Sequence, residues 1–171
     1  IEKVASVEDY LDFLNKEISK HISNLITYET NENSSAVVSS FFTITGNIER
    51  IGDHAMNVCG YSRKLAERNI SFSSQATEEL IQMRDVCLKA MDSLLDREGG
   101  DLLWLSDIAA LEQRIDDMTV QFRRAHLNRM KEGVCTDEAC ILYAELLTDF
   151  ERIGDHVLNI GQELAAIHEH V

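Results

Sequence analysis

One ten-residue segment occurs twice in this chain, and the duplication limits the folds that the chain can adopt. Residues 49–58 read ERIGDHAMNV and residues 151–160 read ERIGDHVLNI, so seven of the ten positions are identical at an offset of 102 residues. The other three positions exchange one apolar residue for another. Such a repeat within a chain of 171 residues indicates two copies of one structural unit.

A weaker repeat lies upstream of each copy, because residues 7–18 align with residues 111–122 at an offset of 104. Together the two repeats give each half of the chain two pairs of acidic residues spaced four positions apart. Residues at this spacing lie on one face of a helix, about one turn apart. The four pairs are Glu8/Asp12 and Glu49/Asp53 in the first half, and Glu112/Asp116 and Glu151/Asp155 in the second.

Composition and charge narrow the class of protein. Proline is absent and glycine occurs only eight times, which favours helices over turn-rich β folds. A net charge of −14 argues against nucleic acid as a partner, because phosphate binding needs an excess of Lys and Arg. The four cysteines show no C-x-x-C spacing, which indicates free thiols in a reducing cytosol. The chain has no apolar stretch of the ~18 residues that a membrane span requires, and it does not open on a signal peptide.

The spacing of apolar residues predicts five long helices. They are expected over residues 1–28, 35–67, 73–97 and 101–131, and from Thr136 to the C-terminus. The breaks between them are a polar turn at 29–34, residues 69–74, the Glu98-Gly99-Gly100 sequence and Gly133. Phe41, Phe42 and Trp104 are predicted to lie in the core. The repeat also predicts a sixth helix before Ile1, whose absence leaves the first half short of one wall and its acidic site more open.

The acidic pairs are predicted to meet within each half. Consecutive helices joined by a short turn are antiparallel, so residues equally far from the turn lie at the same level. The pairs of the first half are symmetric about residue 30, and those of the second about residue 133. They therefore lie roughly 30 Å from the turn in each hairpin, at ~1.5 Å per residue. Four carboxylates held together repel one another unless a proton or a cation neutralises them. Oxygen ligands suit iron, manganese or magnesium, although any single pair is equally consistent with solvated surface charge.

Other residues of the repeated segment are further candidates: the asparagines as ligands or in contact with the ligands, and the histidines in contact with the ligands or at the surface. Asn57 and Asn159 continue the acidic stripe by one turn, and a hydrogen bond between helices is the alternative role. His54 and His156 lie ~100° around the helix from the aspartates. Arg50 and Arg152 are placed to pair with carboxylates of neighbouring helices.

At the repeated ERIGDH hexamers the sequence resembles the PhoU family. The resemblance implies an all-α fold of tandem three-helix bundles with internal pseudo-symmetry, here with the first helix missing. It divides the chain into residues 1–70 and 71–171. It also implies that Glu8, Asp12, Glu49 and Asp53 form one metal cluster, and that Glu112, Asp116, Glu151 and Asp155 form the other. The expected metal is iron, with manganese, magnesium or zinc as alternatives.

Two shorter segments suggest a subfamily. Residues 125–135 and 69–73 look like the cytoplasmic C-terminal domain of bacterial sodium–phosphate cotransporters. This resemblance implies a non-catalytic regulatory domain at the cytoplasmic face of the inner membrane, with the transporter domain of the same polypeptide as partner. The alternative is a stand-alone PhoU regulator of a phosphate ABC transporter and its sensor kinase. Further alternatives are a purely structural bundle and a di-metal carboxylate enzyme, and a homodimer is a possible assembly. The enzyme is disfavoured because its Glu-x-x-His pair does not match the five-residue spacing of Glu49 and His54.

Overall fold

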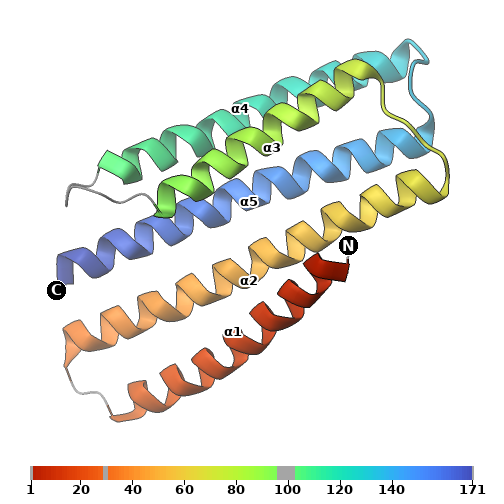
Figure 1. Cartoon of the computed structure of the whole chain (residues 1–171). Coiled ribbons are helices and arrows are strands. Elements are labelled where there is room, and N and C mark those ends of the chain that lie inside the picture. The colour runs from red at the N-terminus through yellow and green to blue at the C-terminus, as the bar shows by residue number, and fades with distance from the viewer. Residues whose placement is uncertain (1, 29–30, 96–102, 171) are drawn as a thin grey trace.

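A computed structural model describes residues 2–28, 31–95 and 103–170, and these residues form five α-helices (Figure 1). The helices are α1 (Glu2–Tyr28), α2 (Glu32–Glu67), α3 (Ser74–Leu95), α4 (Leu103–Lys131) and α5 (Asp137–His170). The all-α prediction is therefore confirmed. None of the described helices is long and apolar enough to cross a membrane. The expected division after residue 70 falls in the connection between α2 and α3, and it remains a prediction.

Side-chain caps fix the starts of α2, α3 and α5. The hydroxyls of Ser73 and Thr136 accept hydrogen bonds from the backbone N–H groups three residues on, as an N-cap does. Gly133 follows α4 with a φ of 68°, a conformation that costs glycine little. The predicted start of α2 at residue 35 was wrong, because the Asn31 side chain caps the helix and it begins at Glu32. The predicted helix end at 97, the stop at 98–100 and the helix start at 101 lie outside the described residues.

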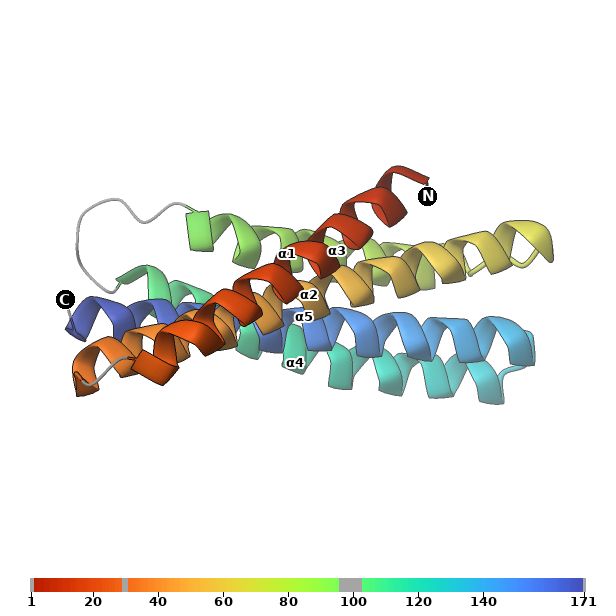
Figure 2. The same cartoon turned by 90° about the horizontal axis from the view of Figure 1, so that it is seen from below.

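Helix α5 occupies the centre of the molecule and packs against α2, α3 and α4. The outermost helix, α1, packs against α2 alone among the described helices and crosses it obliquely (Figure 2). Equivalent helices of the two repeats, α2 and α5, thus lie side by side. This contact places the two copies of the repeated hexamer at the middle of the molecule.

The main hydrophobic core lies among α3, α4 and α5. Its most deeply buried side chains are Met83, Ile108, Ile115, Tyr143, Leu147 and Val157. By contrast, Phe41 and Phe42 on α2 are 45% and 51% exposed, so their predicted place in the core was wrong. Since only α1 and α5 cover α2 among the described helices, the rest of its apolar circumference faces solvent. Trp104 is partly buried and packs against the core as expected.

A buried ionic network joins the three helices of this core. Arg129 of α4 donates two hydrogen bonds to the carboxylate of Glu79 on α3, at 2.9 and 2.6 Å. The hydroxyl of Tyr143 on α5 donates to the same carboxylate. The exposed fractions of Glu79, Arg129 and Tyr143 are 5%, 6% and 1%. Burial and the carboxylate of Glu79 raise the pKa of Tyr143, so the phenol remains a hydrogen-bond donor.

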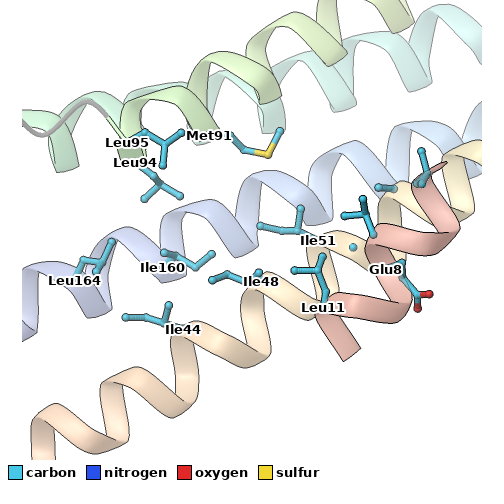
Figure 3. A pocket seen from close by; sticks show the side chains of 14 residues that line it. Glu8, Leu11, Ile44, Ile48, Ile51, Met91, Leu94, Leu95, Ile160 and Leu164 are labelled. Carbon is cyan, nitrogen blue, oxygen red and sulfur yellow. The ribbon is translucent and has the colours of Figure 1, made fainter. Parts of the chain in front are cut away.

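An apolar groove of about 480 Å³ lies among α1, α2, α3 and α5 (Figure 3). Apolar side chains from all four helices line it, including Leu11, Ile48, Met91 and Ile160. Glu8 also borders the groove, but its carboxylate points away from the apolar side chains. The first half is therefore more open than the second on the apolar side of α1.

Candidate metal centres

Three carboxylates meet in each half of the molecule. Oxygen atoms of Glu8, Asp12 and Asp53 all lie within 4.8 Å of one another, and so do those of Glu112, Asp116 and Asp155. In each cluster the first two residues come from the first helix of a hairpin and the third from the second helix. The equal-level argument predicted that all four acidic residues of each half meet, and the structure brings three of them together. Asp53 is exposed whereas Asp155 is partly buried, in keeping with the more open first half.

The glycine of each hexamer lets the two helices approach at the cluster. A Cβ atom on Gly52 would lie 3.0 Å from the side chain of Leu11, and one on Gly154 would lie 3.0 Å from that of Ile115. Leu11 and Ile115 each occupy the position directly before the aspartate of their acidic pair. The repeated glycine therefore seats this apolar residue against the opposite helix, which brings the flanking carboxylates towards Asp53 and Asp155.

Alanine at Gly154 is expected to destabilise the protein more than alanine at Gly52. The added methyl group would meet three atoms of Ile115 at 3.0–3.6 Å, and Ile115 is fully buried. Overpacking of this kind costs about 1–3 kcal/mol, which exceeds the ~1 kcal/mol that alanine gains in a helix. At Gly52 only the end of the half-exposed Leu11 side chain is closer than 3.5 Å, so that gain offsets the clash. Thermal unfolding of the two variants tests this, and equal melting temperatures would contradict it.

Two of the eight predicted ligands lie outside the clusters. Glu151 pairs with Arg123 of α4, whose Nη2 atom lies 2.9 Å from Oε2 of Glu151. Glu49 is close enough to the first cluster that Asp53 and Asp12 raise its pKa, together with a larger contribution from burial. The structure therefore holds Glu49 beside the carboxylates of its own half and directs Glu151 towards an arginine.

One cation contacts an aspartate of each cluster. Lys16 Nζ lies 3.6 Å from Oδ2 of Asp12, and Arg152 Nη1 lies 3.2 Å from Oδ2 of Asp155. Arg152 thus contacts a predicted ligand of its own helix rather than a carboxylate of a neighbouring helix, and the matching residue Arg50 is exposed. Both ion pairs are on the surface, where such pairs contribute little stability, so a metal ion competes with them at low cost.

The remaining charge is uncompensated, and it raises the pKa of several carboxyl groups. Burial, then Asp116 and Asp155, raises the pKa of Glu112. Burial and the charge of Asp155 likewise raise the pKa of Asp116, and burial and the charge of Asp12 raise that of Glu8. Each cluster therefore favours uptake of a positive charge, either a proton or a metal ion.

The metal-free protein is expected to lose stability as the pH rises through the raised pKa of Glu112. Below the ordinary glutamate pKa of 4.5, the carboxyl group is protonated in both the folded and the unfolded chain. Above it, the folded chain retains the proton longer, so the free energy of unfolding falls with rising pH. Urea unfolding in the presence of a chelator tests this. The free energy of unfolding of Glu112→Gln should increase relative to that of the wild type as the pH rises to about 7.5. The exposed Glu78→Gln is the control, and a difference independent of pH would contradict the expectation.

The donor set of the clusters fits a metal ion. Carboxylate oxygens are the ligands that magnesium, manganese and iron accept, and three of them converge in each half. Glu8, Asp12 and Asp53 would hold an ion in the first half, and Glu112, Asp116 and Asp155 would hold one in the second. Glu49 is the residue best placed to join the first set.

The histidines and asparagines of the repeat form a different arrangement, between α2 and α5. Nδ1 of His54 lies 2.6 Å from Oδ1 of Asp149, and Asn57 donates to the same oxygen at 3.1 Å. In the matching contact, Nδ1 of His156 lies 2.8 Å from Oδ1 of Asn47. Asn159 completes it with a hydrogen bond of 3.5 Å to that oxygen.

The acceptors of these two contacts, Asn47 and Asp149, were not predicted as site residues. They are separated by the same 102 residues as the hexamers and precede each repeated glutamate by two positions. Extending the repeat alignment to short polar side chains would have found them. The rings of His54 and His156 stack with their centroids 5.4 Å apart, so the network joins the two halves through a pseudo-twofold contact.

Fold and site together define an all-helical protein of two related halves, each with a cluster of three carboxylates in its helical hairpin. A family model described as the PhoU domain matches residues 1–61 and 80–164, and the chain therefore belongs to the PhoU family. This confirms the resemblance seen in the repeated hexamers.

Individual relatives agree with the family assignment. The chain is 29% identical over 172 residues to a protein of Thermotoga maritima named "Phosphate-specific transport system accessory protein PhoU homolog 1", a match that covers 96% of this chain and 71% of the relative. The fold resembles the PhoU regulatory protein of Streptococcus pneumoniae, with a TM-score of 0.81, 18% identity and coverage of 97% and 77% of the two chains. It also resembles PhoU of Pseudomonas aeruginosa, with a TM-score of 0.77, 18% identity and coverage of 99% and 81%.

Proposed function

We propose that this chain regulates phosphate uptake as a metal-binding accessory protein of a phosphate transporter, at the cytoplasmic face of the membrane, and that it catalyses no reaction. Membership of the PhoU family carries the proposal. The name of the Thermotoga maritima relative, an accessory protein of a phosphate-specific transport system, favours a stand-alone regulator over the sodium–phosphate cotransporter domain suggested by residues 69–73 and 125–135.

The role proposed for the acidic clusters is to bind metal ions, iron above all, with manganese, magnesium or zinc as alternatives. The clusters recur at equivalent positions of the two halves, and a shared metal requirement would account for that. Occupancy would remove the repulsion within each cluster and fix the angle between the helices of each hairpin. The shape of the surface that contacts the transporter would then depend on bound metal, and this form of regulation requires no catalysis.

Transport in cells that lack the gene tests the regulatory role. Uptake of radiolabelled phosphate should change when the gene is deleted and return to normal when the wild-type chain is supplied. Dependence of the regulated uptake on ATP supports the stand-alone assignment, whereas dependence on sodium supports the cotransporter domain. Uptake that is indifferent to the gene would overturn the proposal.

Elemental analysis of the purified protein tests the metal role separately. Protein prepared without chelator should contain metal bound by the acidic clusters, and the Asp53→Asn/Asp155→Asn variant should lose that metal. A variant that restores normal phosphate uptake without binding metal would leave the regulatory role standing and remove the metal role.

A further inference from the structure

A second kind of donor cluster lies at the connection between α4 and α5. Ligand atoms of His126, Cys135 and Cys140 all lie within 4.8 Å of one another. His126 and Cys140 are buried and Cys135 is partly buried. His126 is ten residues beyond Asp116 on α4, a distance of ~15 Å along the helix, so this cluster is separate from the acidic one.

Helix capping explains part of this arrangement. Cys135 precedes the cap residue Thr136, and Cys140 is the fourth residue of α5. These are the two positions that pack together in a hydrophobic staple. A staple accounts for the proximity of the two thiols, but it requires no imidazole. His126 comes from another helix, and its ring packs against Tyr143 with the centroids 4.7 Å apart.

We propose that His126, Cys135 and Cys140 bind a zinc ion. Two thiolates and an imidazole are the ligands that zinc favours, in contrast to the carboxylates of the acidic clusters. Three protein ligands leave the fourth tetrahedral position to a water molecule. A cavity of about 10 Å³, lined in part by His126, Cys135 and Tyr143, has room for one.

The surroundings of the three side chains suit this role. The backbone of Cys140 lies beside the His126 ring, and polar contacts of this kind help to orient a metal-binding imidazole. The guanidinium of Arg129 lies nearby, and its charge is compensated by the two hydrogen bonds to Glu79. Binding would release the two thiol protons to solvent, leaving the thiolates on zinc. The ion would then tie the end of α4 to the start of α5.

Cobalt(II) is the probe that separates this site from the acidic clusters, because only sulfur ligands give a thiolate-to-cobalt charge-transfer band. The fully reduced protein should develop this band together with the visible bands of tetrahedral cobalt, and one equivalent of zinc should remove both. The Asp53→Asn/Asp155→Asn variant should give the same spectrum. Cys59→Ser is the matched control, since Cys59 is partly buried and lies outside the cluster.

Cys135→Ser and Cys140→Ser should each abolish the band, and His126→Gln should weaken zinc binding by more than the ~10–100-fold that loss of an orienting side chain causes. Circular dichroism checks that the variants fold. X-ray absorption at the zinc edge of the wild-type protein should show two sulfur neighbours, a result independent of any variant. The proposal is overturned if reduced wild-type protein gives no sulfur signal. It is equally overturned if the signal survives both serine substitutions, or if the two cysteines form a disulfide while the reduced form binds no zinc.

Discussion

Replacing Glu79 by glutamine is expected to lower the free energy of unfolding by about 3–5 kcal/mol, the cost of removing one partner from a buried ion pair. The carboxylate accepts two hydrogen bonds from Arg129 and one from Tyr143. An amide offers a single acceptor oxygen and no charge, so the guanidinium would remain buried without compensation. For a chain of this size the melting temperature should fall by roughly 6–20 °C.

Two further variants make the Glu79 result specific. Glu78→Gln removes the same charge from the neighbouring exposed position and should change the melting temperature little. The double variant Glu79→Met/Arg129→Met removes both charges and should recover much of the loss, because well-packed apolar residues often replace a buried pair without cost. Equal melting temperatures for Glu78→Gln and Glu79→Gln would contradict the expected role of the network.

This network marks the limit of what the sequence could predict. Periodicity and the repeat predicted the helices, and the level of each acidic pair followed from the positions of the turns. Glu79 is neither repeated nor part of a motif, and its partners lie 50 and 64 residues away on two other helices. Only the packing of α3 against α4 and α5 brings the three side chains together. A pattern along one helix does not show which residues of other helices pack against it.

The acidic site shows the same limit on a smaller scale. The spacing placed Glu49 and Glu151 in equivalent positions, yet Glu151 pairs with Arg123, whereas burial and the charges of Asp53 and Asp12 raise the pKa of Glu49. Whether an acidic residue meets a cation depends on a residue of the neighbouring helix, and the two repeats differ there. The sequence therefore predicted three members of each cluster from what the halves share, and it could not predict the fourth.

Manganese(II) is expected to stabilise the protein through the acidic clusters. A ligand that binds only the folded state adds about 2.7 kcal/mol at a concentration 100-fold above its dissociation constant. This corresponds to an increase of roughly 5–11 °C in melting temperature for each occupied site. The increase should diminish as the pH falls, because protons compete for carboxyl groups whose pKa is raised, such as those of Glu112 and Asp116.

Single substitutions should divide this stabilisation between the halves. Asp53→Asn is expected to abolish the contribution of the first cluster and Asp155→Asn that of the second, since each supplies the only described ligand from the opposite helix of its hairpin. Without manganese, both variants should be as stable as the wild type or slightly more stable, by ~0.2–0.5 kcal/mol for each like-charge contact removed. The sign of the effect therefore reverses when the metal is added, which simple damage to the fold would not produce.

Matched controls come from the acidic residues beside the clusters. Asp9→Asn and Asp117→Asn change the net charge by the same amount, but both residues are exposed and neither belongs to the three-carboxylate clusters. They should retain the full increase in melting temperature with manganese. If all four variants responded alike, manganese would be acting on the overall charge of −14 by general attraction. The duplicated clusters would then be surface charge, and the repeat would preserve only the packing of Leu11 and Ile115 against their glycines.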